Sequence, residues 1–250
     1  MIQVLHRAFD ILELLAKDPD RPKPLGEVAG ALSLNSATCA NILKTMVDRG
    51  YVRQEAPKKG YTIGLAWRGF VREDVRYRRL ITAAEAPMTH LASSVRETVL
   101  LAVLEGQRRF NLCLVEGDAS LQVRRDIIIS DDIYRTATGR LLLAHLGPAS
   151  LEAVLVRRGL PRPEEWPEAG SPDELRSTLA RVRDEGRVII TRGDLVAMAY
   201  PIRVGGAVTA ALGLYLPAFR FDGEHRGRVL QDMEETAGTI SRHLAEGETS

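Results

Sequence analysis

Side chains suited to contact with DNA gather on one face of the segment from Ser36 to Lys44. They are Ser36, Thr38, Ala40, Asn41 and Lys44. Hydroxyl and amide groups can hydrogen-bond bases or phosphates, lysine can neutralise a phosphate, and alanine lets the backbone approach base edges closely. Small polar residues of this kind also form ordinary solvated helix faces. Two further lysines in a nearby turn, Lys58 and Lys59, favour the nucleic-acid interpretation.

The spacing of apolar residues predicts two short helices that position these side chains. The first begins at about Pro24 and has an apolar stripe at i, i+3, i+4 and i+7, formed by Leu25, Val28, Ala29 and Leu32. The pattern breaks at residues 33–35, where Asn35 or Ser36 can cap a second helix. That helix has its own apolar stripe, formed by Cys39, Ile42, Leu43 and Met46. Two short helices joined by a three-residue turn indicate a helix-turn-helix.

A β-ribbon is predicted directly after the second helix. Strands at 51–55 and 61–64 flank the Pro/Gly turn that holds Lys58 and Lys59, as in a wing beside a DNA duplex. An opening helix supplies the third helix of the core, with apolar residues at Val4, Ala8, Ile11, Leu12 and Leu15. We therefore predict a winged helix-turn-helix domain over residues 1–64.

The distribution of charge indicates two parts with different tasks. Residues 1–80 contain 14 Lys and Arg against 9 Asp and Glu, a net charge of +5, whereas the remainder carries −4 and the whole chain +1. Only the first part has the positive charge expected of a DNA-binding surface. The chain's 250 residues also exceed a single winged helix several-fold.

The rest of the chain predicts an α+β domain. We predict that residues 65–79 form an arginine-rich helix, which we interpret as a linker, and that residues 80–250 form a second domain. A helix is predicted from Leu80 to Val95, with a kink or interruption at Pro87. Strands are predicted at 98–105, 110–116, 187–191, 196–204 and 207–216, and helices at 137–146, 148–158, 171–185 and 222–244.

The segment Thr136-Ala137-Thr138-Gly139 opens a predicted helix and is a candidate anion site. The unpaired amides and the positive dipole at a helix N-terminus favour a carboxylate. A plain helix cap without a ligand is the alternative.

Catalytic motifs are absent from the sequence, and the five histidines are scattered without metal-ligand spacing, so we expect neither an enzyme nor a cofactor. The adjacent pair Asp131-Asp132 fits a solvated turn or a pocket edge better than acid/base catalysis. Cys39 and Cys113 fit reduced core residues. No apolar run resembles a signal peptide or a membrane span, so we expect a soluble, cytoplasmic protein.

Several segments resemble the IclR family of bacterial transcription regulators. They are the winged helix, the linker helix, Tyr61-Thr62-Ile63-Gly64-Leu65, residues 136–144, Ala199-Tyr200-Pro201-Ile202 and residues 210–214. The resemblance spans nearly the whole chain. It implies that residues 80–250 are an effector-binding and oligomerisation domain, with a GAF-like antiparallel sheet flanked by helices. It also implies a homodimer or homotetramer and a small-molecule effector that is often a carboxylate.

The resemblance also implies an effector pocket, at which this chain departs from the family pattern. Family members often have an acidic residue where this chain has Arg187, and Cys or Ser where it has Ala197, Gly213 and Tyr215. We expect the pocket between Ala137, Thr138 and Gly139 and these strand residues, with Leu195, Met198 or Leu101 as an apolar wall. Small residues at 197 and 213 would leave room for a mid-sized carboxylic acid, including an aromatic one, and Arg187 would favour an anion if it points inward.

The recognition helix departs from the family as well, because Asn41 stands where a basic residue is usual. We therefore expect a transcription regulator that binds a pseudo-palindromic double-stranded DNA operator of its own. The alternative is a DNA-binding protein whose C-terminal domain only assembles or recruits partners. Dependence of DNA binding on a small molecule separates the two.

Overall fold

The protein is described by a computed structural model covering residues 2–19, 21–55, 59–66, 75–117 and 132–246. The chain divides into two compact units, Met1–Val75 and Arg76–Ser250. Each unit has its own hydrophobic core and is described by itself.

Within its described residues, the first unit has the predicted order of three helices and two strands. The helices are α1 (Gln3–Ala16), α2 (Leu25–Ala31) and α3 (Ser36–Asp48). Their apolar stripes meet in one core, formed by Ile11, Leu15, Val28, Ala29, Cys39, Ile42, Leu43, Met46 and Val52. The side chain of Asn35 caps α3 by accepting a 2.9 Å hydrogen bond from the amide of Ala37. The prediction of a helix-turn-helix is confirmed.

The wing consists of strands β1 (Val52–Gln54) and β2 (Tyr61–Ile63), which pair antiparallel. Lys23 adds a bridge on the other side of β2, because its amide and carbonyl both bond to Tyr61. Gly60, at φ +112°, has no room for a side chain, since a Cβ there would lie 2.9 Å from the backbone of Lys23. This close approach ties the ribbon to the segment before α2.

The second unit is built on a five-stranded antiparallel sheet with the order β4-β3-β7-β6-β5. Its strands are β3 (Thr98–Glu105), β4 (Arg108–Val115), β5 (Val188–Arg192), β6 (Leu195–Val204) and β7 (Ala207–Pro217). All five lie within two residues of the predicted ranges, because alternating or fully apolar runs between glycine turns are strong strand signals. The α+β prediction is confirmed.

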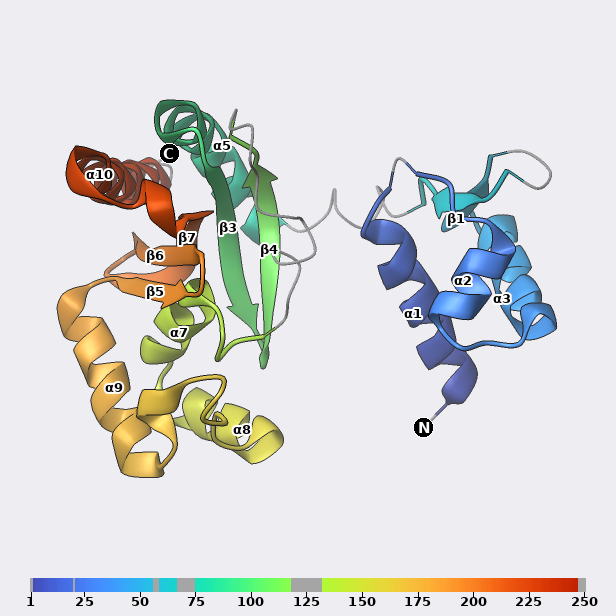
Figure 1. Ribbon diagram of the computed structural model, residues 1–250, viewed down its shortest axis with the longest axis horizontal. Coiled ribbons are helices and arrows are strands. Elements are labelled where there is room, and N and C mark those ends of the chain that lie inside the picture. The colour runs from blue at the N-terminus through green and yellow to red at the C-terminus, as the bar shows by residue number, and fades with distance from the viewer. Residues whose placement is uncertain (1, 20, 56–58, 67–74, 118–131, 247–250) are drawn as a thin grey trace. The chain divides into compact units, whose positions relative to one another are not determined.

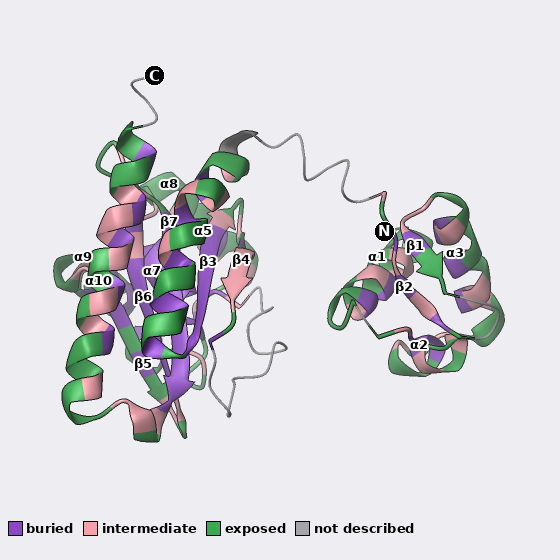
Figure 2. Ribbon diagram, turned by 90° about the horizontal axis from the view of Figure 1, so that it is seen from above, coloured by how far each residue is buried: buried purple, intermediate pink, exposed green. Residues whose placement is uncertain are grey.

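Helices cover both faces of the sheet (Figure 1). Helices α5 (Val75–Val95) and α10 (Gly223–Glu246) pack on one face. Helices α7 (Ala137–Ala144), α8 (Pro148–Arg158) and α9 (Pro172–Glu185) pack on the other, which we call the α7 face. The described part of the unit also contains two short 3-10 helices, η1 (Pro167–Ala169) and η2 (Ala218–Arg220). Because both faces are covered, most strand residues are buried (Figure 2).

The structure differs from the two helices predicted at 65–79 and from Leu80 to Val95. Leu65 and Ala66 lie in a turn, residues 67–74 fall outside the described ranges, and α5 is already helical at Val75. The domain boundary that we place at residue 80 stays a prediction. Pro87 does not interrupt α5, although it cannot donate a hydrogen bond to the carbonyl of Ala83. A ring nitrogen of His243, from α10, lies 3.4 Å from that carbonyl oxygen.

Candidate DNA-binding and effector sites

The outward face of α3 presents the predicted DNA-contacting residues to solvent. Ser36, Asn41 and Lys44 are exposed, and Thr38 and Ala40 are half-buried at the edges of the face. The opposite stripe of the helix is buried in the core. The structure therefore brings these side chains together on one surface, as a helix that enters the major groove requires.

Thr45 belongs to the same face, although the sequence analysis missed it. It is exposed, and its hydroxyl donates a 3.0 Å hydrogen bond to the carbonyl of Asn41, one turn earlier. Its spacing of four residues from Asn41 was the available signal.

The wing carries both free and compensated positive charge. Lys59 is exposed, while Lys58 lies outside the described residues. Arg53 instead pairs with Glu55, whose carboxylate also accepts a 3.0 Å hydrogen bond from the hydroxyl of Thr62. Hydrogen bonds from Arg53 and then Thr62 hold the pKa of Glu55 below its usual value. Arg53 thus braces the ribbon, and Lys59 is better placed to meet a phosphate.

The start of α7 is a buried cap. Ala137, Thr138 and Gly139 are all buried, and the amide of Gly139 donates a 3.2 Å hydrogen bond to the Thr136 hydroxyl. A Cβ on Gly139 would overlap the carbonyl of Ile133, so this position needs glycine. The amide of Gly139 is therefore occupied by the cap, and it does not point at a ligand as the sequence analysis expected.

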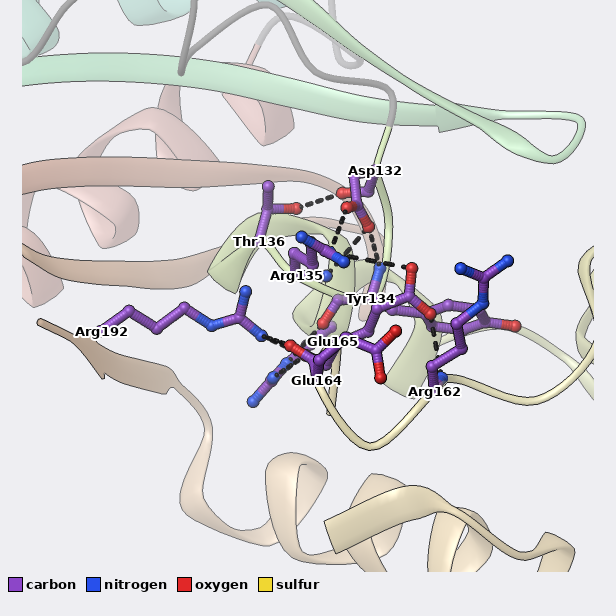
Figure 3. Close-up of polar contacts among 9 residues, drawn as sticks. Asp132, Tyr134, Arg135, Thr136, Arg162, Glu164, Glu165 and Arg192 are labelled. Carbon is purple, nitrogen blue, oxygen red and sulfur yellow. Dashed lines mark hydrogen bonds and ion pairs between the residues drawn. The ribbon is translucent and has the colours of Figure 1, made fainter. Parts of the chain in front are cut away.

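A network of polar contacts holds this cap in place (Figure 3). Asp132 accepts hydrogen bonds of 3.0 Å from the amides of both Tyr134 and Arg135, and its carbonyl accepts one of 2.7 Å from the Thr136 hydroxyl. Arg135 lies within 3.7 Å of the Glu165 carboxylate, and Arg192 donates to the carbonyl of Glu165. Asp132 thus forms part of a turn, while Asp131 lies outside the described residues.

Arg140, on α7, anchors the helix to the same segment. Its guanidinium stacks 4.4 Å from the ring centre of Trp166 and donates 2.8 Å hydrogen bonds to the carbonyls of Tyr134 and Glu165. Burial, and then the nearby charge of Arg192, lowers the pKa of Arg140 to about 10, so it stays protonated at neutral pH. These contacts fix where α7 lies on the sheet.

The sheet residues predicted for the effector site lie mostly on the α7 face. Ala197 and Tyr215 pair across β6 and β7 and belong to the core beneath α7, against which Leu195 also packs. Gly213 lies under Thr138, whose methyl group would be 2.7 Å from a Cβ at position 213. The expectation that Gly213 leaves room for a ligand is therefore wrong, because Thr138 fills that space.

Two of the proposed wall residues are on the opposite face. Met198 and Leu101 pack against α5 and α10, because side chains on a strand alternate between faces. Met198 directly follows Ala197, and Leu101 pairs with Leu212, which belongs to the same core. Both faces of these strands are apolar, so hydrophobicity alone could not assign them.

Arg187 also lies apart from the predicted effector-site residues beneath α7. It lines a depression of about 370 Å³ together with Tyr200, Arg203, Glu234 and Ser241, which involves β6 and α10. Tyr200 belongs to the core on the α5 and α10 face. The prediction that Arg187 shares a pocket with Ala137 and Tyr215 is therefore wrong, because side chains alternate along the strand and Val188, the next residue, is the one that packs on the α7 face.

Arg109 lies with the residues beneath α7 instead, although it was not predicted. It is buried on β4, opposite Leu104 of β3, and its guanidinium donates to the side chain of Asn111 and to the hydroxyl of Thr138, at 3.4 Å. Its positive charge also acts on Tyr215, where it opposes the rise in pKa that burial causes. Our prediction began this strand at Phe110, one residue too late to include Arg109.

Other site types find no support among the described residues. There, no cluster of three or more His, Cys, Asp or Glu side chains is arranged to hold a metal ion. Across the same ranges, no helix is both long and apolar enough to cross a membrane.

Both parts of the chain match described protein families. Residues 4–56 match the IclR helix-turn-helix domain, and residues 74–242 match the family described as bacterial transcriptional regulator IclR C-terminal.

Full-length relatives show the same similarity. The HTH-type transcriptional regulator XynR of Escherichia coli is 26% identical over 98% of each chain. The glycerol operon regulatory protein of Streptomyces coelicolor is 30% identical, also over 98% of each chain. Among solved structures, an IclR homologue from Microbacterium hydrocarbonoxydans in complex with 4-hydroxybenzoate is 25% identical, with a TM-score of 0.70 over 99% of this chain and 100% of that one.

Proposed function

The chain belongs to the IclR family of bacterial transcriptional regulators, and from this premise we propose that it binds a pseudo-palindromic DNA operator under the control of a small carboxylic acid. The relatives found are transcriptional regulators rather than enzymes. Action on chromosomal DNA would place it in the cytoplasm.

The observation that carries the DNA-binding proposal is the outward face of α3. Exposed Ser36, Asn41 and Lys44 lie on a helix whose other side is fixed by the core, and Lys59 is exposed on the adjoining ribbon. In this proposal Ser36, Thr38 and Asn41 address bases with Ala40 allowing close approach, and Lys44, Lys58 and Lys59 meet phosphates.

The effector proposal is supported by the polar groups buried beneath the start of α7. Thr138, Tyr215 and the Arg109 guanidinium meet there among apolar side chains, a composition typical of small-molecule sites. A related protein was solved with 4-hydroxybenzoate, an aromatic carboxylic acid. We propose that this chain binds a mid-sized carboxylic acid at Ala137, Thr138, Ala197 and Tyr215, with Leu195 nearby.

A homo-oligomer is proposed because one recognition helix reads too few bases for a useful operator. Helix α1 supports this, since large apolar side chains in and beside it stay between half and two-thirds exposed: Ile2, Val4, Leu5 and Phe9. We propose that α1 of a second copy covers them, in a homodimer or in each dimer of a homotetramer.

Selection from a random duplex library, followed by anisotropy titration, tests the whole proposal. The selected duplex should contain an inverted repeat, and 4-hydroxybenzoate or a related acid should change its apparent Kd. Tight operator binding that no organic acid alters would favour the alternative, in which the second unit only assembles the protein or recruits partners.

A further inference from the structure

The depression of about 370 Å³ beside α10 is a second place in this unit where a small molecule can bind. Its lining comes from the end of α9 and the turn after it, from β6 and from α10. Tyr200 lines it and belongs to the core that α5 and α10 form with the sheet, so the depression lies on the face opposite α7. Four small or short residues leave the space open: Gly186, Pro201, Ala237 and Gly238.

A buried hydroxyl group lines this depression without a well-formed hydrogen bond. Tyr200 is only 4% exposed, and within the described part of the chain its hydroxyl has no partner at normal hydrogen-bond geometry. Burial raises the pKa of Tyr200, and the positive charge of Arg187 opposes that rise, so the guanidinium lies close to the hydroxyl. A buried hydroxyl has lost its hydration, and a ligand that supplies an acceptor stabilises it.

Charges of both signs lie beside the same hydroxyl. Arg187 is half-buried and Glu234, on α10, is exposed, and the carboxylate of Glu234 also acts on the pKa of Tyr200, in the same direction as burial. Although both line the depression, no ion pair within 4.0 Å joins Arg187 to Glu234. A positive and a negative group therefore border one space without neutralising each other.

The other polar groups of the lining have partners within the protein. The hydroxyl of Ser241 accepts a 3.0 Å hydrogen bond from the amide of Arg203 and donates one of 2.8 Å to the carbonyl one turn earlier on α10. The guanidinium of Arg203 is directed at a carbonyl in the turn after β6, at 3.5 Å. Glu185 lies 4.0 Å from Arg181 on α9. The groups left for a ligand are thus the Tyr200 hydroxyl and the two charges beside it.

We propose that this depression binds an α-amino acid, with its carboxylate on Arg187 and the Tyr200 hydroxyl and its ammonium group on Glu234. A guanidinium offers two parallel N–H donors to a carboxylate, and the phenol O–H supplies a third. A simple anion would be repelled by Glu234 and a simple cation by Arg187, whereas a zwitterion satisfies both. The site lies on the opposite face of the sheet from the proposed effector site and does not depend on it.

Calorimetry on the full-length protein tests the proposal. The probes are the common α-amino acids at millimolar concentration, and each one that binds is compared with its N-acetyl derivative and its carboxamide. Acetylation removes the positive charge and amidation the negative charge, while the side chain stays the same. At least one amino acid should bind, and both of its derivatives should bind about tenfold or more weakly.

Substitutions assign each charge of the ligand to a residue. Arg187→Gln, Tyr200→Phe and Glu234→Gln should each weaken the amino acid about tenfold. Glu234→Gln should not weaken the N-acetyl derivative any further, because the ammonium group that Glu234 recognises is already missing. A merely structural effect would weaken all ligands alike. Glu235→Gln is the control and should leave the Kd unchanged, since Glu235 lines a separate groove beside α5.

Every outcome decides the question. The assignment is overturned if no amino acid binds, if a derivative binds as tightly as its parent, or if the Kd is unchanged in Arg187→Gln or Glu234→Gln. A loss of binding in Glu235→Gln would also overturn it. If Tyr200→Phe does not fold, the derivatives and the two charge variants still give the answer. The proposed regulatory function fails separately, when no organic acid changes operator affinity.

Discussion

Asn41 and Lys44 are neighbours on the exposed face of α3, yet their side chains have different chemistry. Lys44→Ala should weaken binding to every duplex and reduce the salt dependence, log Kd against log salt, by about one unit, because one phosphate contact is lost. Asn41→Ala should instead reduce discrimination at one base pair, by about 1–3 kcal/mol. Anisotropy titrations with operator and scrambled duplexes at several salt concentrations measure both effects. Equal losses on both duplexes in Asn41→Ala would contradict a base-reading role.

A buried carboxyl group should make the stability of the second unit depend on pH. Glu97 is 3% exposed, its carboxylate lies 3.2 Å from the Arg220 side chain, and burial raises its pKa to about 7, against the opposing charges of Arg220 and Arg96. Because the folded pKa exceeds the unfolded one, the contribution of Glu97 is complete below about pH 4.5 and is lost as the pH rises through about 7.

The matched variant is Glu97→Gln, which keeps the shape of the protonated acid. Between pH 5 and 8 the wild type should lose on the order of 2 kcal/mol of unfolding free energy relative to this variant. Urea unfolding at a series of pH values measures the difference. Parallel curves for the two proteins would show that Glu97 does not titrate in this range.

At the scale of elements, the position of α7 depends on one glycine. A methyl group on Gly139 would overlap the carbonyl group and Cα of Ile133, which are backbone atoms that cannot rotate away. Gly139→Ala should therefore cost about 2–3 kcal/mol of stability and weaken acid binding, since α7 must shift. Gly147→Ala, where a Cβ meets nothing within 4 Å, is the control and should cost less than about 1 kcal/mol. Thermal unfolding of the two variants should separate them clearly, and equal melting temperatures would contradict this account of α7.

The elements were predictable where the signal is local. Asn35 caps α3, and Ser171 with Glu174 forms a capping box on α9, because a cap depends only on residues two or three positions apart. The strands followed from apolar runs between glycine turns.

The face of the sheet on which each side chain lies was less predictable than the positions of the strands. Strands covered on both faces are apolar throughout, so Met198 looked as suitable for the effector site as Ala197. Arg109 was missed for a related reason, since no local pattern distinguishes a buried arginine from a solvated one. Both errors concern long-range packing, whereas the buried and exposed faces of α3 followed from helical spacing.

At the scale of the whole molecule, the apolar surface of α1 predicts how two copies assemble. Leu5 and Phe9 are 51% and 57% exposed, so replacing both with glutamine should cost the monomer little and weaken the dimer. Sedimentation at micromolar concentration should show a lower mass for this variant, and operator binding should require more protein. Val156→Gln on α8, where the side chain is 79% exposed, is the control and should change neither. An unchanged mass in the double variant would place the dimer contact elsewhere.

Because Pro87 cannot donate a backbone hydrogen bond, the stiffness of α5 varies along its length. A continuous helix resists bending along its length, but one lacking a backbone bond bends most easily at that turn. The stiffness of α5 is therefore lowest between Ala83 and Pro87, inside the second unit and well past Val75, where the division between the two units falls. His243 of α10 contacts the Ala83 carbonyl in this turn. How easily α5 bends therefore depends on a helix that lies far away in the sequence. Amide hydrogen exchange along α5 should accordingly be faster at this turn than in the turns on either side of it.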